Sequence, residues 1–140
     1  CAIGNNARRA AQFDHRDLSH APILHHTSAI LSPSAVLGHG TLVVAGAIVN
    51  ADARVGRGVI LNTGCSVDHD CDIGDFVHVS PGARIAGGVT IGAQSWIGIG
   101  AVLREGIHIG QNAIIAAGAA VVTDVEDGAT YGGVPATRIK

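Results

Sequence analysis

The chain has 140 residues, of which 47% are apolar and 14% charged, and its formal net charge at pH 7 is −2. This composition supports one domain with a hydrophobic core and excludes a disordered or strongly acidic segment. The absence of a basic block argues against a nucleic-acid groove, and the apolar runs are too short to span a membrane.

The cysteines and the first residues give little evidence of special chemistry. Three cysteines are too few and too irregularly spaced for a disulfide framework, and no signal peptide is visible. We therefore expect a cytoplasmic, reduced protein. The stretch IGNN at 3–6 is weak as a phosphate loop, because it lacks the strand and the spacing of a dinucleotide-binding fingerprint.

A six-residue repeat occupies about residues 31–126. Every sixth residue from Leu31 to Val121 is Leu, Ile or Val, the following residue is often Gly, and the fifth position is mostly small. A period of six fits a short strand plus a turn, with the branched residue inward, the glycine permitting the sharp turn and the small residue filling the crowded interior. Such units bury their apolar faces only by stacking into a solenoid.

This pattern resembles the hexapeptide-repeat left-handed β-helix, in which three hexapeptides form one triangular coil. The resemblance implies an all-β fold of about five coils, with a short N-terminal α/β remnant, and it also supplies the handedness. Residues 18 apart would then stack in columns. The columns of interest are Ala51, His69, Gly87, Glu105 and Thr123; Thr63, Pro81, Ile99 and Ala117; and Ile60, His78, Trp96 and Ile114.

A polar cluster, VDHDCDIGDFVHVS at 67–80, interrupts the apolar repeat. His69 falls at an outward turn position, and the residue stacked above it is Gly87. An exposed imidazole beside a missing side chain and a free backbone N–H offers what acyl transfer needs: a base, room for a thioester and a donor for the oxyanion. Either Asp68 or Asp70 could hold the second nitrogen of the ring.

Residues 61–92, LNTGCSVDHDCDIGDFVHVSPGARIAGGVTIG, resemble a particular group of sugar O- and N-acetyltransferases. This is the sialic acid O-acetyltransferase family, which also contains bacillosamine and perosamine N-acetyltransferases. The shared core is N-T-x-x-x-[VI]-[DE]-H-[DE]-x-x-I-G-x-[FY]-x-H, which begins here at Asn62 and ends at His78. The closing YGGVPATRIK resembles the G-x-P-A-x-x-[IV] tail of the same enzymes.

The resemblance implies an acetyl-CoA-dependent acetyltransferase without a metal, acting on an amine or hydroxyl of a nucleotide-linked sugar. It implies that His69 is the general base and that Asp70 orients it. The residues implied to contact acetyl-CoA are His78, Gly87, Ile99 and Ala117, and those implied on the acceptor side are Asn62 and Asp68. The family also implies a homotrimer with sites between subunits.

We divide the chain into residues 1–27, 28–126 and 127–140. By the resemblance, the first is the remnant of a sugar-nucleotide-binding α/β domain, the second the acyltransferase solenoid and the third a C-terminal extension. The stretch CAIGNNARRAAQFD looks like the last strand and helix start of the α/β domain. Only this part of that domain is recognisable, so the residues of the acceptor half of the site are less fully represented in the sequence than those of the cofactor half.

Two other functions remain open from the sequence. A zinc carbonic anhydrase on the same fold would need several histidines around a metal, but no His-x4-His pair occurs within the repeat. A solenoid that binds acyl-CoA or a partner without catalysis would fit the incomplete sugar domain. Neither the acceptor nor the choice between N- and O-acetylation follows from the residues.

Overall fold

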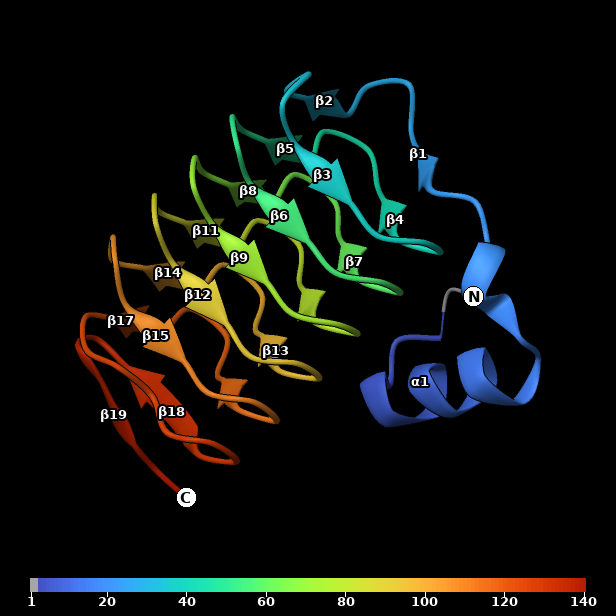
Figure 1. Cartoon of the computed structure of the whole chain (residues 1–140). Coiled ribbons are helices and arrows are strands. Elements are labelled where there is room, and N and C mark those ends of the chain that lie inside the picture. The colour runs from blue at the N-terminus through green and yellow to red at the C-terminus, as the bar shows by residue number, and fades with distance from the viewer. Residues whose placement is uncertain (1–2) are drawn as a thin grey trace.

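A computed structural model describes residues 3–140 (Figure 1). One helix, α1 (Asn6–His15), and a single 3₁₀ turn, η1 (Leu18–His20), precede a series of two-residue strands. Each strand of the series begins six residues after the previous one, from β1 (Leu24–His25) to β17 (Ala120–Val121). A hairpin of β18 (Thr130–Gly133) and β19 (Ala136–Arg138) follows.

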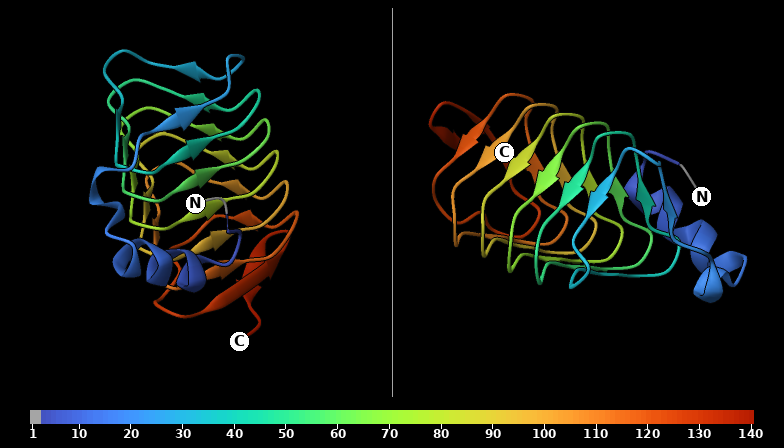
Figure 2. Two further views of the ribbon diagram at one scale, coloured as in Figure 1. Left: turned by 90° about the vertical axis from the view of Figure 1, so that its right-hand side faces the viewer. Right: turned by 90° about the horizontal axis from the view of Figure 1, so that it is seen from above.

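The strands from β1 to β17 form three parallel sheets, in which each strand pairs with strands three places away in the chain. Figures 1 and 2 show the resulting coils stacked along one axis. We call the sheets faces A, B and C in chain order. Face A contains β1, β4 (Leu42–Val43), β7 (Ile60–Leu61), β10 (His78–Val79), β13 (Trp96–Ile97) and β16 (Ile114–Ile115), followed by β18 and β19. At the C-terminal end, β18 pairs with β16, and β19 runs antiparallel to β18.

Faces B and C complete the triangular section. Face B contains β2 (Ile30–Leu31), β5 (Ile48–Val49), β8 (Ser66–Val67), β11 (Arg84–Ile85), β14 (Val102–Leu103) and β17. Face C contains β3 (Val36–Leu37), β6 (Arg54–Val55), β9 (Asp72–Ile73), β12 (Thr90–Ile91) and β15 (His108–Ile109). The predicted left-handed β-helix is confirmed, with nearly six coils rather than about five.

The strand register confirms the predicted stacking columns. His78 pairs with Ile60 on one side and with Trp96 on the other, and Trp96 pairs in turn with Ile114. At the corner between faces B and C, the N–H of Gly88 donates to the carbonyl of His69, 2.9 Å away. Side chains 18 residues apart are therefore neighbours on the surface.

The core consists of the branched residues together with the small residue of each repeat. Both Cys65 and Cys71 occupy small-residue positions, are buried and carry free thiols, and burial raises the pKa of Cys65 to about 12. The buried hydroxyl of Ser95 donates to the carbonyl of Gly110 at 2.6 Å. The interior is thus thin but closely packed, as the scarcity of aromatic residues requires.

The glycine after each branched residue has a different role from the one predicted. These glycines do not have a positive φ. Instead, a Cβ on Gly98 would lie 2.6 Å from the backbone nitrogen of Ala117 in the next coil, and Gly74 is similarly close to Ala93. The left-handed residue is two positions later, where Gly82 and Gly88 stand but also Asp70. The first glycine therefore permits close stacking of coils, and the second position makes the turn.

Helix α1 packs against the corner between faces C and A (Figures 1 and 2). The ring of Phe13 meets that of Phe76 edge-on, with centroids 5.2 Å apart. The helix begins after Asn5, whose side chain accepts from the N–H of Arg8 at 2.9 Å, a standard N-cap. None of the helices in residues 3–140 has the length and apolarity needed to cross a membrane.

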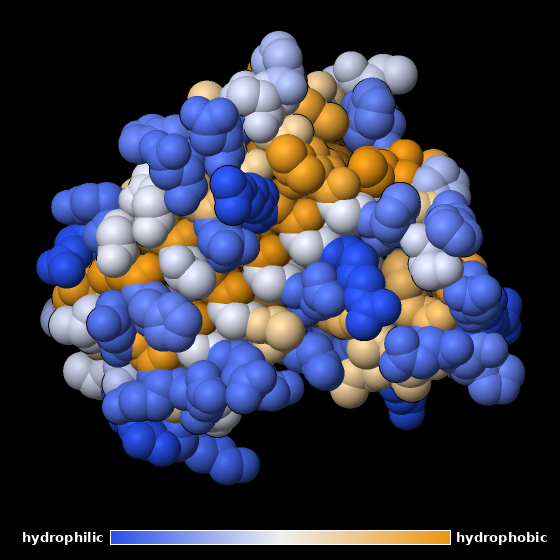
Figure 3. All heavy atoms as spheres, in the orientation of Figure 1, coloured by the Kyte–Doolittle hydropathy of each residue, from blue (hydrophilic) through white to orange (hydrophobic). Residues whose placement is uncertain are grey.

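The three faces differ in their outward side chains. Face C presents mainly polar ones, including Arg54, Asp72, Thr90 and His108. Faces A and B present more apolar ones, and Trp96, Val102 and Ile114 are at least 40% exposed. Figure 3 shows hydrophilic residues along the turns and a hydrophobic area around β2 and β3, where Ile30 and Val36 are exposed.

Candidate active site

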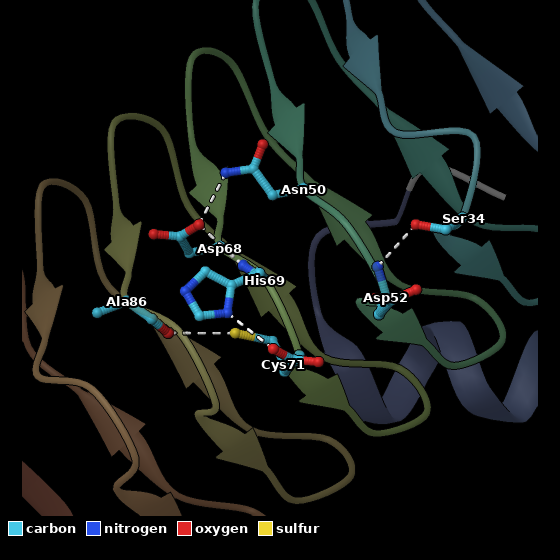
Figure 4. Close-up of polar contacts among 8 residues, drawn as sticks. Ser34, Asn50, Asp52, Asp68, His69, Cys71 and Ala86 are labelled. Carbon is cyan, nitrogen blue, oxygen red and sulfur yellow. Dashed lines mark hydrogen bonds and ion pairs between the residues drawn. The ribbon is translucent and has the colours of Figure 1, made fainter.

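His69 lies at the corner between faces B and C, in the turn from β8 to β9 (Figure 4). Its side chain points outward and is 63% exposed. The ring nitrogen Nδ1 is 2.8 Å from Oδ2 of Asp70, and no hydrogen bond to Nε2 is formed within residues 3–140. Asp70 has a φ of 58°, a left-handed conformation that Asp tolerates better than most residues. The turn thus holds one nitrogen of His69 and leaves the other accessible.

Asp68, the other neighbour of His69, is used differently. Its Oδ1 accepts from the backbone N–H of His69 and from Nδ2 of Asn50, both at 2.8 Å. These hydrogen bonds lower the pKa of Asp68, with Asn50 as the largest cause. Asp68 therefore fixes the backbone of the turn, whereas Asp70 faces the ring. The sequence alone could not distinguish these two arrangements.

The electrostatic environment of His69 favours the protonated form of its ring. The hydrogen bond to Asp70 and the negative charge of Asp68 raise the pKa of the imidazole above its ordinary value. An imidazole that is held by a carboxylate at Nδ1 can accept a proton at Nε2, and the carboxylate then stabilises the cation. The pair has the arrangement required of a general base and its orienting group.

Gly87 lies directly over the imidazole, as the stacking columns predicted. A Cβ on Gly87 would be 2.7 Å from Cε1 and Nε2 of His69, so any larger residue here would displace the ring from its present position. The imidazole itself therefore takes part of the space that was expected for a thioester. The N–H of Gly87 donates no hydrogen bond to any residue of the described chain.

A groove of about 690 Å³ runs along face A and the corner between faces A and B. Four predicted site residues line it together: Asn62, His78, Ile99 and Ala117. Its other lining residues are Ser80, Pro81, Trp96, Gly98, Ile114, Ile115 and Ala116. Most of these belong to the columns of His78 and Ile99 or lie beside them, so the repeat itself carries the signal that locates the groove.

His78 forms a largely buried part of this groove. Its ring stacks on Trp96 with centroids 5.2 Å apart and planes at 19°, and the indole N–H donates to the hydroxyl of Ser80 at 2.8 Å. Nε2 of His78 is 3.1 Å from Nδ2 of Asn62. Burial lowers the pKa of His78, and the positive charge of Arg9 acts in the same direction. The surroundings of His78 therefore favour its neutral form, whereas those of the exposed His69 favour its protonated form.

The predicted site residues form two separate groups in one chain. His69, Asp70 and Gly87 are not among the residues lining the groove, and face B lies between them and its corner residue Ile99. Within residues 3–140 no three His, Cys, Asp or Glu side chains are grouped to hold a metal ion. One subunit thus carries an accessible histidine at one corner and an apolar groove at another.

Comparison with known proteins identifies the fold and the class of protein. The family model for the bacterial transferase hexapeptide (six repeats) matches residues 88–122. The acetyltransferase domain of PglB from Neisseria gonorrhoeae, solved in complex with acetyl coenzyme A, is 42% identical; the match covers 99% of this chain and 68% of that chain, with a TM-score of 0.92. No curated protein sequence matches the chain.

Two further solved structures are similar. PerB from Caulobacter crescentus, solved in complex with CoA and GDP-perosamine, is 40% identical, with 99% of this chain and 68% of that chain covered and a TM-score of 0.93. WeeI from Acinetobacter baumannii is 27% identical, with the same coverage and a TM-score of 0.90. The extent of these matches, together with the repeat and the polar cluster, confirms the resemblance seen in the sequence: the chain is an acyltransferase that belongs to the hexapeptide-repeat sugar acetyltransferases.

Proposed function

We propose that this chain transfers the acetyl group of acetyl-CoA to a sugar amine, the sugar being carried on a nucleotide. The observation that carries the proposal is the His69–Asp70 pair, in which Nδ1 is held at 2.8 Å and Nε2 remains accessible. The similar structures support the choice of reactants, because one was solved with acetyl coenzyme A and another with CoA and GDP-perosamine. A hydroxyl acceptor is the alternative.

The proposed reaction is a direct transfer in a ternary complex. Nε2 of His69 takes a proton from the acceptor amine while the nitrogen lone pair attacks the thioester carbonyl. Asp70 stabilises the imidazolium that forms, and the free N–H of Gly87 binds the oxyanion. The tetrahedral intermediate then collapses, the C–S bond breaks, and the CoA thiolate leaves and takes up a proton.

We propose the groove on face A as the site of acetyl-CoA. Its wall is almost entirely apolar where Pro81, Ile99 and Ala117 stack at the corner, which suits the pantetheine arm. His78 and Trp96 provide a flat aromatic wall beside it. Trp96 is 40% exposed, so part of its ring remains accessible to a ligand.

We propose that the complete site is formed between subunits of a homotrimer. The separation of His69 from the groove within one chain supports this arrangement, since the reacting atoms of the two substrates must meet. The apolar outward residues of faces A and B, compared with the polar face C, also favour those two faces as the contact surfaces. The BC corner of one subunit would then lie against the groove of its neighbour.

The acceptor side is proposed to include Asn62 and Asp68. Oδ1 of Asp68 already binds Asn50 and the backbone of His69, which leaves Oδ2 for a hydroxyl or ammonium group of the sugar. We further propose the division at residues 27 and 126, with a remnant of a sugar-nucleotide domain first and a C-terminal extension last. Because Cys65 and Cys71 are both free thiols, a cytoplasmic location is also proposed.

The test measures CoA release with acetyl-CoA and GDP-perosamine, followed by other nucleotide-linked amino sugars and their hydroxyl analogues. His69→Ala should lower turnover by about a hundredfold or more. His108→Ala, at an exposed position on face C, is the matched control and should leave turnover unchanged. Near-normal turnover in His69→Ala would contradict the assignment of the base.

A separate result would favour the second candidate, a solenoid that binds acyl-CoA without catalysis. Acetyl-CoA would then raise the thermal midpoint of the wild-type protein, yet no acceptor sugar would release CoA. Binding and transfer are therefore measured on the same preparation.

A further inference from the structure

Arg9 of helix α1 is a cation buried among backbone carbonyls. Its side chain is fully buried, and it donates to the carbonyl oxygens of Ile3, Gly58 and Phe76 at 2.6 to 2.7 Å and to Oδ1 of Asn6 at 2.8 Å. No carboxylate in the described chain pairs with it. Desolvation lowers the pKa of Arg9 only to about 10, so it remains charged at neutral pH.

The consequence is that residues 3–9, which we call the N-terminal clasp, are tied to the solenoid at the corner between faces C and A. A buried cation is costly unless its donors are satisfied, and here the carbonyls come from both the clasp and two different coils. The clasp therefore has one defined position relative to face A.

This position brings the carbonyl oxygen of Gly4 to 3.4 Å from Nδ1 of His78. A carbonyl oxygen can only accept a hydrogen bond. The pairing is thus favourable only when Nδ1 carries the proton.

The opposite side of the ring leads to the same requirement. Oδ1 of Asn62 accepts the backbone N–H of Thr63 at 2.8 Å, and a backbone N–H can only donate. This orients the amide so that its Nδ2 faces Nε2 of His78 at 3.1 Å. An amide nitrogen can only donate, so Nε2 must be the unprotonated nitrogen.

We infer that the N-terminal clasp fixes His78 as its Nδ1–H tautomer, and that Nε2 of His78 then helps to hold the Asn62 amide in the orientation set by Thr63, which makes Arg9 a positioning residue for the acceptor side of the site. The assignment of Asn62 to the acceptor side rests on the proposed function, whereas the tautomer does not. With both nitrogens engaged, His78 contributes to the groove through its stacked ring.

The first test is nuclear magnetic resonance of the full chain labelled with ¹⁵N-histidine, at pH 7 and without ligands. Two-bond nitrogen–proton correlations should show Nδ1 of His78 protonated and Nε2 unprotonated. The signal is assigned by its loss in His78→Gln. A protonated Nε2, as either the other neutral tautomer or the imidazolium, would overturn the inference whatever the activity of the protein.

The second test compares Arg9→Met, Arg9→Lys and Asn5→Ala. Asn5→Ala removes the N-cap of the same helix but none of the hydrogen bonds that the Arg9 side chain donates, so it reports the effect of weakening the helix alone. Arg9→Met should mix the two tautomers of His78 and raise the KM of the acceptor about tenfold, the effect of one misplaced hydrogen bond, with little change in the KM of acetyl-CoA. Arg9→Lys keeps the positive charge, so its His78 tautomer and its acceptor KM should lie between those of Arg9→Met and those of the wild type.

Other outcomes separate the two proposals. If Asn5→Ala and Arg9→Met change the tautomer and the acceptor KM equally, Arg9 only anchors the helix and the positioning role is wrong. If the tautomer responds as expected but no acceptor is acetylated, the positioning of the ring stands and the proposed function fails. If Arg9→Met does not fold, Arg9→Lys provides the same comparison.

Discussion

His69 and His78 belong to the same repeat, His69 in the turn between β8 and β9 and His78 in strand β10, and their surroundings give them opposite properties. His69 is exposed at a corner and its pKa is raised by Asp70, whereas His78 is 7% exposed on a face and its pKa is lowered by burial. One ring keeps a nitrogen accessible, and the other has both nitrogens beside polar groups. The two histidines occupy different positions of the repeat unit, a turn and a strand, and their neighbours one coil away, Gly87 beside His69 and Trp96 beside His78, complete the difference between them.

Among the substitutions around these two histidines, Gly87→Ala is expected to lower turnover the most. The new methyl group would need the space of the His69 ring, since its ideal position is 2.7 Å from Cε1 and Nε2. Displacing the base by about 1 Å should lower turnover by roughly a hundredfold. The measurement is the rate of CoA release, alone and in the His69→Ala background.

The double variant is the control for this explanation. If Gly87 acts by leaving room for His69, adding Gly87→Ala to His69→Ala should lower turnover little further, because both changes act through the same imidazole. A full additional loss would instead indicate that the methyl group blocks the thioester or removes its N–H contact.

Asp70→Asn should lower turnover by about tenfold to a hundredfold and also change its pH dependence. Asn tolerates the left-handed conformation, so the turn should be preserved. The base works only when neutral, so in the wild type the rate falls as the pH drops below the raised pKa of His69. Removing Asp70, the largest cause of that rise, should move this acidic limb to lower pH.

The profile of kcat/KM against pH is the measurement, and Asp72→Asn on face C is the matched control. An acidic limb that stays in place in Asp70→Asn would show that a group other than His69 controls the rate. A shift to higher pH would contradict the assigned role of the carboxylate.

A binding experiment should distinguish the groove, which we expect to bind acetyl-CoA, from the corner of His69, which we expect not to be needed for binding. Ala117→Phe fills the corner of the groove, whereas His69→Ala removes a side chain outside it. Acetyl-CoA at about a hundred times its Kd should stabilise the wild type by about 2.7 kcal/mol. We expect this thermal shift to persist in His69→Ala and to be lost in Ala117→Phe.

The unliganded thermal midpoints provide the control, since Ala117 is exposed and its replacement should not unfold the solenoid. Loss of the thermal shift in both variants would mean that the corner between faces B and C, where His69 lies, also takes part in binding acetyl-CoA. Its retention in Ala117→Phe would place the cofactor elsewhere.

The sequence predicts the columns well because a strict period leaves little freedom in how coils stack. The period alone places Ile99 and Ala117 on one corner and His78 under Trp96, as the structure has them. The choice between Asp68 and Asp70 did not follow from the residues themselves, because it depends on the rotamers within one turn, and only the family resemblance indicated Asp70. A clasp around Arg9 could not be foreseen either, since its partners are backbone carbonyls, which every residue carries.

The smallest effect is expected from Asn50→Ala, which tests whether the corner is organised beyond its two reacting groups. Asn50 touches neither the ring nor the groove, but its hydrogen bond to Asp68 helps hold the backbone N–H of His69. Losing one such bond should lower turnover about threefold to tenfold without affecting the thermal shift by acetyl-CoA. The Asp68 carboxyl would also lose the main cause of its lowered pKa, which carbon-detected titration can follow. If turnover is unchanged while this pKa rises, the turn keeps His69 in place without Asn50, and Asp70 alone orients the base.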